Sequence, residues 1–141
     1  KRPRFLYSDS PEALAVLGDP LDFVVAQSIF SHCGMDLVIS WVRAIAQHLT
    51  PGGALVATFV PGENDTAEKG WVYPGCVRFK PDTLRRIAAD AGLRFTSLDW
   101  RHPQQTWVFF TAPGFDASEL EGQAPSWNRM LERILRAGSS S

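Results

Sequence analysis

The chain has 141 residues, of which 45% are apolar and 21% charged, a composition typical of one globular domain. Fourteen Lys and Arg residues against fifteen Asp and Glu residues give a net charge of -1. This balance argues against binding to nucleic acid or to an anionic membrane, because both require a basic surface. No secretory signal and no apolar run of membrane-spanning length is seen, so we expect a cytoplasmic protein.

The first part of the chain predicts a strand, a short helix and a second strand. Arg4 to Asp9 has the pattern of a short strand. Ser10 is a typical helix cap and Pro11 suits the first helical position, so a helix is expected from there to Gly18. Leu21–Ala26 is almost continuously apolar, which predicts a strand buried on both faces, as in a parallel sheet.

A helix and another buried strand are expected next. In the segment Asp36–Leu49, apolar residues recur every four positions at Leu37, Trp41, Ile45 and Leu49. The sequence Thr50-Pro51-Gly52-Gly53 then predicts a break in regular structure. Ala54–Val60 is the second apolar strand of the predicted parallel pair.

The second half begins with a loop of about fifteen residues from Pro61 to Gly75, longer than a connector requires and therefore typical of a lid or binding loop. A short strand is predicted at Val77–Phe79. A helix should then start at Pro81 and end at Gly92. Two strands follow, Leu93–Trp100 and Thr106–Thr111, and their short connection predicts an antiparallel hairpin.

This order of elements predicts an α/β fold of the Rossmann-like type. We expect a mostly parallel sheet with right-handed crossovers, an antiparallel hairpin at its carboxyl-terminal end, and flanking helices. The amphipathic segment Pro125–Ala137 is expected to be a helix that docks on the core or binds a partner. Residues 1–137 then form a single domain, and residues 138–141 are expected to be a disordered tail.

Three segments resemble class I S-adenosylmethionine-dependent methyltransferases. Asp22-Phe23-Val24-Val25-Ala26-Gln27-Ser28-Ile29-Phe30-Ser31-His32 is similar to the central strand of that family and the loop that leaves it. Leu49-Thr50-Pro51-Gly52-Gly53-Ala54-Leu55 is similar to the family's turn before the next strand. The predicted hairpin, Arg94–Thr111, resembles the antiparallel strands that end the same fold.

The sequence also departs from this family. It lacks the Gly-rich loop after the first strand and the acidic residue after the second, which bind the cofactor. The chain therefore resembles the carboxyl-terminal half to two-thirds of the domain, and we expect an amino-terminally incomplete domain. Alone it should bind S-adenosylmethionine weakly or not at all. The residues leave open whether it is a fragment of a longer protein or a naturally truncated relative.

The resemblance assigns candidate cofactor contacts. Asp9, with Ser10 after it, matches a polar position that often faces the adenine in this family, although an Asp before a helix is also an ordinary cap. Gln27 and Ser28 follow the predicted central strand, where ligands of open α/β sheets bind, and they match positions near the methionine end of the cofactor.

His32 is the candidate catalytic residue, because an imidazole can act as a general base near neutral pH. The alternative is that His32 only orients the loop that follows it. Trp71 and Tyr73 in the long loop either cover a substrate or hold the loop in place. The three histidines form no metal-binding pattern with the carboxylates, and Cys33 and Cys76 form no disulfide framework, so no metal is expected.

Two functions follow from this reading. The first is S-adenosylmethionine-dependent methyl transfer to a small molecule, performed as part of a longer chain. The alternative is a truncated, non-catalytic module of the same fold that acts in binding or assembly. A buried strand left open at the sheet edge would expose unpaired backbone groups. We expect that edge to pair with strands of a longer protein, with Arg4–Asp9, or with a second copy in a homodimer.

Overall fold

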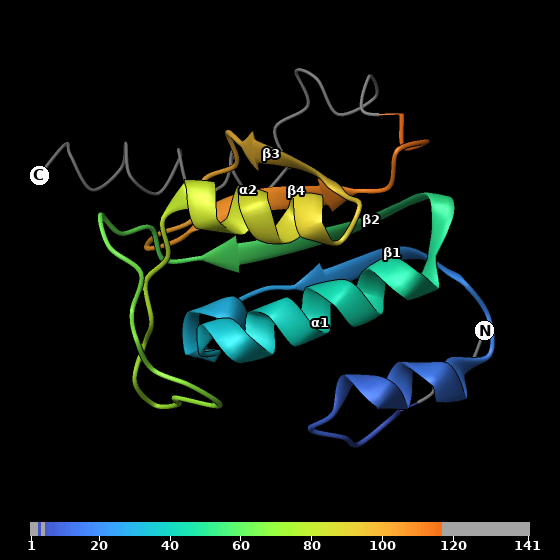
Figure 1. Ribbon diagram of the computed structural model, residues 1–141, viewed down its shortest axis with the longest axis horizontal. Helices are drawn as coiled ribbons and strands as arrows, with labels where there is room; N and C mark the ends of the chain where they lie inside the picture. Colours follow the sequence, from blue (N-terminus) through green and yellow to red (C-terminus); the bar gives the residue numbers. More distant parts are fainter. Residues whose placement is uncertain (1–2, 4, 117–141) are drawn as a thin grey trace, which may run out of the picture.

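The computed structural model describes residue 3 and residues 5–116 (Figure 1). The predicted helix Pro125–Ala137 and the tail at 138–141 lie outside the described residues. The elements follow in the order η1 (Pro11–Leu17), β1 (Leu21–Ala26), η2 (Phe30–His32), α1 (Met35–His48), β2 (Leu49–Phe59), α2 (Pro81–Asp90), β3 (Arg94–Leu98) and β4 (Thr106–Thr111). Within the described part of the chain, none of the helices has the length and hydrophobicity to cross a lipid bilayer.

Four strands form one sheet in the order β1-β2-β4-β3. β1 pairs with β2 in parallel, and β4 pairs antiparallel with both β2 and β3. The parallel pair is joined through α1, as expected for a buried crossover unit. The predicted α/β class, the adjacent parallel strands and the closing antiparallel strand are therefore confirmed.

The predicted break at Thr50–Gly53 is wrong, because β2 begins at Leu49 and continues through it. The pairing shifts there: Leu21 lies opposite Leu49, whereas Phe23 lies opposite Ala54. The extra residues therefore form an irregularity within the strand rather than a loop between elements. A Cβ on Gly53 would lie 2.8 Å from the carbonyl oxygen of Leu21, so glycine is what allows the two strands to approach.

The predicted strand from Arg4 to Asp9 is also wrong, because residues 5–9 have no strand pairing. Phe5 and Tyr7 remain 79% and 92% exposed, so this apolar segment lacks the sheet neighbour that would bury it. The helix after it starts and ends as predicted, with Ser10 accepting a hydrogen bond from the Glu12 N–H and Gly18 in the left-handed conformation. It is a 3-10 helix rather than an α-helix.

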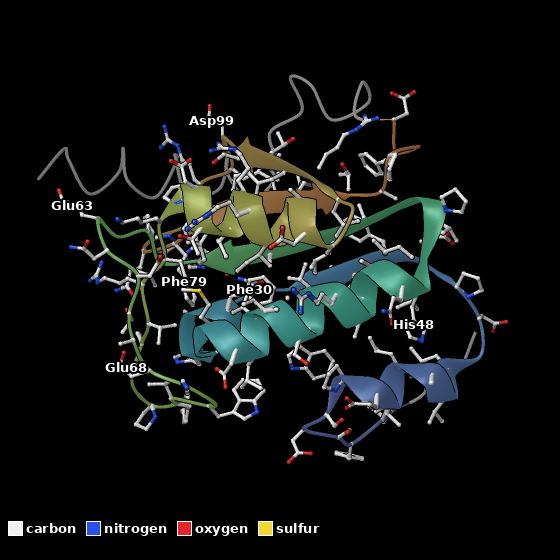
Figure 2. All side chains as sticks on the ribbon, in the orientation of Figure 1. Phe30, His48, Glu63, Glu68, Phe79 and Asp99 are labelled. Atoms are coloured by element: carbon white, nitrogen blue, oxygen red, sulfur yellow. The ribbon has the colours of Figure 1, made fainter. Side chains whose placement is uncertain are left out.

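The helices α1 and α2 lie on one face of the sheet (Figure 1), over the main core. Phe30 and Phe79, labelled in Figure 2, belong to this core, with Leu55 and Phe110 from the sheet and Val42 from α1. The opposite face carries a second cluster made by Ala54, Val56, Trp107 and Phe109.

β1 departs from the expected burial. Phe23 and Val25, which alternate along the strand on the face of the second cluster, are 52% and 59% exposed. Val24 and Ala26, which face the main core, are half-buried and buried. The prediction that Leu21–Ala26 is buried on both faces is therefore wrong. Its outer edge has no strand partner among the described residues, because β1 ends the sheet order.

Candidate functional site

The carboxyl ends of the two parallel strands meet the start of the antiparallel strand at one edge of the sheet. β1 ends at Ala26 and β2 ends at Phe59, which lies opposite Thr106, the first residue of β4. Open α/β sheets bind ligands outside the carboxyl ends of their strands. The residues that follow β1 and precede β4 are therefore the ones to inspect.

Ser28 occupies the exit from β1 in a conformation uncommon for a residue with a side chain. Its φ is 55°, in the left-handed region. The Ser28 backbone N–H donates to the Oγ1 atom of Thr58 over 2.7 Å, and Thr58 is fully buried on β2. This hydrogen bond turns the chain away from the strand and holds the Ser28 side chain at the sheet edge. Gln27, beside it, is exposed.

Gln105 joins this exit loop to the start of β4. Its Nε2 donates to the Ser28 hydroxyl over 3.2 Å and reaches the Ser31 hydroxyl, in η2, at 3.5 Å. Its Oε1 is buried and has no hydrogen-bond partner among the described residues. A buried acceptor without a hydrogen bond lowers the folding stability by about 1–3 kcal/mol. The Oε1 atom could therefore accept a hydrogen bond from a bound ligand. Gln105 was not identified from the sequence, because the contact that distinguishes it joins positions 77 residues apart.

His102 supports Gln105 from the turn between β3 and β4. Its Nδ1 accepts hydrogen bonds from the backbone N–H groups of Gln104 and Gln105, at 3.3 and 3.0 Å. An Nδ1 that accepts must carry a lone pair, so the ring proton is on Nε2. Burial lowers the pKa of His102, which keeps the ring neutral. This histidine is therefore an organised part of the turn.

His32 is the last residue of η2 and directly follows Ser31, whose hydroxyl Gln105 reaches. Its Nδ1 is 2.7 Å from the carbonyl oxygen of Gly75. A carbonyl only accepts, so Nδ1 carries the proton and Nε2 presents its lone pair when the ring is neutral. The ring also meets Tyr73 edge-on, at 5.2 Å between ring centroids. The geometry is compatible with both predicted roles, because His32 holds the long loop and keeps Nε2 available.

The long loop is fastened to η2 and to the start of α1. Backbone N–H groups of Val72 and Val77 donate to the carbonyl oxygens of His32 and Ser31, each over 2.9 Å. The Asp36 carboxylate accepts from the Gly70 N–H at 3.0 Å, and this bond is the main reason that the pKa of Asp36 is lowered.

Trp71 and Tyr73 sit on this fastened segment. The backbone of Trp71 bridges to Cys33, and the two aromatic side chains are 50% and 76% exposed. Most of the Tyr73 ring is therefore available beside His32. The structure brings Tyr73 together with the catalytic candidate, whereas Trp71 is placed on the same segment without a ring contact to His32.

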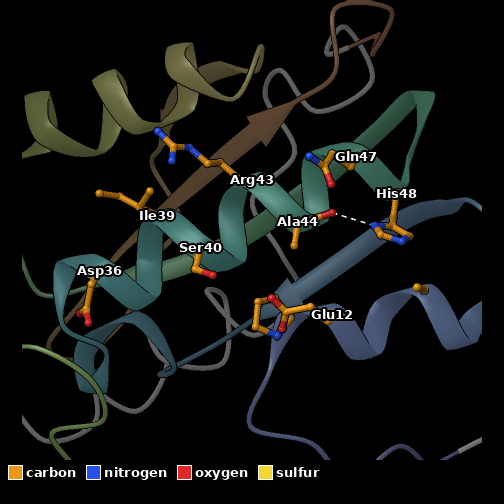
Figure 3. A pocket seen from close by; sticks show the side chains of 10 residues that line it. Glu12, Asp36, Ile39, Ser40, Arg43, Ala44, Gln47 and His48 are labelled. Atoms are coloured by element: carbon orange, nitrogen blue, oxygen red, sulfur yellow. Dashed lines mark hydrogen bonds between the residues drawn. The ribbon is translucent and has the colours of Figure 1, made fainter.

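Asp9 and Ser10 lie at the start of η1, and η1 packs against α1. Among the described residues, no hydrogen bond connects either one to Ser28, His32 or Gln105. A hollow of about 530 Å³ lies between η1 and α1, and its lining residues include Glu12, Asp36 and Arg43 (Figure 3). Asp9 and Ser10, the two predicted adenine-side residues, are therefore separate from Ser28 and Gln105 at the end of β1.

Ser28 and Gln27 follow the last residue of β1, where the sequence resemblance predicts contacts to the methionine end of a cofactor. A glycine-rich loop, which would cradle the rest, is missing from the sequence. Among residues 5–116, no group of three or more His, Cys, Asp or Glu side chains could hold a metal ion.

Several solved structures are similar to this chain. Mitomycin 7-O-methyltransferase MmcR matches 67% of the chain and 30% of its own length, at 18% identity and a TM-score of 0.53. An O-methyltransferase family protein from Burkholderia thailandensis matches 67% of the chain and 31% of its own length, at 17% identity and a TM-score of 0.51. The S-adenosylmethionine-dependent methyltransferase SibL matches 67% of the chain and 32% of its own length, at 12% identity and a TM-score of 0.51. No protein-family profile and no curated protein matches the sequence.

These similarities define the class of fold. The chain has the Rossmann-like α/β fold found in methyltransferases, with a parallel pair of strands and an antiparallel closing hairpin. It spans about a third of the length of each of these three solved structures.

Proposed function

We propose that this chain forms the carboxyl-terminal part of a methyltransferase domain that uses S-adenosylmethionine and acts on a small molecule, within a longer chain. The observation that carries the proposal is the contact of Gln105 with Ser28 and Ser31 at the carboxyl edge of the parallel strands, with His32 next to Ser31 in the chain. The similarity of the fold to solved methyltransferases supports it. The outer edge of β1, which has no strand partner among the described residues, supports the longer chain, because an apolar strand edge is seldom left open in water.

The cofactor would supply an electrophilic methyl group. We assign Ser28 and Gln27 to its amino acid end, because they leave the central strand, and Asp9 and Ser10 to its adenine side, on the basis of the family resemblance. Asp9 and Ser10 lie at the start of η1, away from Ser28, so the two pairs would contact opposite ends of an extended molecule. Most of the remaining cradle would come from residues outside this chain.

His32 is assigned the role of general base toward an acceptor hydroxyl. Its Nε2 would take the proton as the acceptor oxygen forms its bond to the methyl carbon and the carbon–sulfur bond breaks. The carbonyl of Gly75 fixes the ring through Nδ1–H, which leaves Nε2 as the basic atom. Tyr73, and Trp71 on the same loop, are assigned to the acceptor side.

Methyl transfer from radiolabelled S-adenosylmethionine, assayed with the longer protein that contains this chain, tests the proposal. We expect labelled product from a hydroxylated small molecule and little from the chain alone. Calorimetry should detect weak or no cofactor binding by the 141-residue chain. Low-micromolar binding by that chain would contradict the proposed division of the site, and a longer protein without any transfer activity would contradict the function.

The exposed face of β1 favours a second candidate, a binding or assembly module. Phe23 and Val25 are both more than half exposed on a strand whose outer edge has no partner among the described residues. Two copies could pair through these edges, which would satisfy the backbone groups of β1 and cover part of both side chains. Light scattering would then give twice the chain mass of 15.6 kDa, whereas a monomer would exclude this homodimer.

A further inference from the structure

The turn between β3 and β4 borders a hollow of about 600 Å³ that the cofactor assignments do not use. It is lined by residues 98–103, Gln105 and Thr106. Asp99, labelled in Figure 2 near the end of β3, is one of its lining residues. The hollow lies at the carboxyl edge of the parallel strands, because Thr106 is paired with the last residue of β2.

Aromatic side chains give the hollow a wall that is already ordered. The Trp100 ring packs edge-on against Trp107 at 5.8 Å and against Phe109 at 5.6 Å, so neighbouring rings fix its orientation. The His102 ring also meets Trp107, at 6.2 Å. A ring held in this way can bind a second flat ring with little loss of side-chain freedom.

The charges around the hollow cancel. Asp99 and Arg101 contribute opposite charges, and His102 is neutral because its Nδ1 accepts two backbone hydrogen bonds and burial lowers its pKa. The uncharged polar groups of its lining include the His102 Nε2–H donor, the amide of Gln105 and the hydroxyl of Thr106. An uncharged molecule with a hydroxyl group suits this surface better than a phosphate or a carboxylate.

Gln105 connects the hollow to the candidate site. It lines the hollow, and the same side chain donates to the hydroxyl of Ser28 at the exit of β1. We infer that the hollow binds the flat ring of the methyl acceptor, an uncharged hydroxylated aromatic molecule, with Trp100 as its stacking surface and Gln105 between it and the cofactor end. This inference rests on the proposed function, and it adds the substrate class.

Phenol and cyclohexanol are suitable probes, because they share size and hydroxyl group and differ in the aromatic ring. Titrations followed by NMR of the tryptophan indole N–H signals should show phenol binding at Trp100 with an affinity of about millimolar. Cyclohexanol should bind about tenfold more weakly or not measurably. Trp100→Leu should abolish the phenol response, whereas Tyr7→Leu, which removes an exposed ring outside the hollow, should leave it unchanged.

A second variant keeps the test decisive if Trp100→Leu fails to fold. Asp99→Phe places a ring at an exposed position on the hollow and should compete with phenol. Equal binding of phenol and cyclohexanol, or full binding by Asp99→Phe, would overturn the inference. Neither result would touch the proposed methyl transfer, since the labelled-methyl assay tests that activity without reference to this hollow.

Discussion

The backbone N–H of Ser28 and the hydroxyl of Thr58 are 2.7 Å apart, although the two residues are 30 positions apart in the chain. Thr58→Val keeps the shape of the side chain and removes the acceptor. We expect it to lower the free energy of unfolding by about 1–3 kcal/mol, because it leaves the Ser28 N–H unpaired. Urea denaturation measures this loss.

Hydrogen exchange at the Ser28 amide separates that hydrogen bond from packing. Exchange should be faster in Thr58→Val and slow in Thr58→Ser, which retains the hydroxyl. If exchange in the valine variant is as slow as in the unchanged protein, the hydrogen bond does not hold the strand exit.

Gly34 allows the long loop to lie directly against the start of α1. A Cβ at this position would be 2.5 Å from the carbonyl oxygen of Glu68 and 2.5 Å from the Cα of Lys69, both backbone atoms. Gly34→Ala should therefore displace the loop and lower the free energy of unfolding by about 1–3 kcal/mol.

Gly52→Ala is the matched control, because the nearest atom to its added Cβ would be the Gly114 carbonyl oxygen at 3.9 Å, an ordinary contact. Its effect on unfolding should stay within about 0.5 kcal/mol. If both variants lower the free energy of unfolding equally in the same urea titration, the close approach of the loop backbone to Gly34 does not stabilise the loop.

The sequence predicted the strand pairing of the fold, but not every strand boundary or the exposure of β1. The mostly apolar run Leu21–Ala26 predicted a strand with a parallel neighbour, and the structure has both. The break predicted at Thr50–Gly53 was wrong, because pairing of β2 with β1 outweighs the turn preference of proline and glycine there. The exposure of Phe23 and Val25 depends on which strands are present beside β1, which periodicity does not encode.

The candidate site shows the same limit. The placement of Ser28 and His32 after the central strand was predictable from the sequence, and their roles in a site stay predictions. Gln105 was not predictable, because a glutamine before a strand has no distinctive pattern, and its role arises only when β4 is placed beside β2.

The contact between Asp36 and the loop should depend on pH. Its pKa lies below the ordinary value, chiefly because the carboxylate accepts the Gly70 N–H. A lowered folded-state pKa means that the stabilising contribution is fully present above the unfolded value and is lost as pH falls through the folded value. The Gly70 amide signal in NMR should therefore titrate in acid, below about pH 4.

Asp36→Asn provides the control for that titration. The Gly70 signal should then be independent of pH over the same range, because the titrating group is gone. A midpoint above the ordinary pKa of aspartate would contradict the assignment of the hydrogen bond as the dominant cause.

The two cysteines should differ in reactivity. Burial, with a smaller effect of the nearby Asp36 charge, raises the pKa of Cys33 to about 11. Cys76 is exposed. Since the thiolate is the reactive form, iodoacetamide at neutral pH should modify Cys76 and leave Cys33 unmodified in the folded protein. Mass spectrometry should find one adduct, and none in Cys76→Ser; rapid labelling of Cys33 would contradict its burial.

The last prediction separates the two roles open to His32, as a base or as the residue that holds the loop. His32→Asn can keep a donor toward the Gly75 carbonyl, because the asparagine Nδ2 can take the place of Nδ1, but it lacks Nε2. His32→Ala loses both groups. If Nε2 is the general base of the longer protein, both variants should lower kcat by about 10²–10⁴-fold.

Asp9→Ala completes the comparison, because Asp9 is assigned to the adenine side and has no hydrogen bond to His32 in the structure. It should raise KM for S-adenosylmethionine and leave kcat nearly unchanged, as expected when only binding is lost. Steady-state methyl transfer measures both constants for all three variants. Recovery of kcat in His32→Asn would assign His32 to the loop alone, since a retained donor without a basic nitrogen would then be sufficient for turnover.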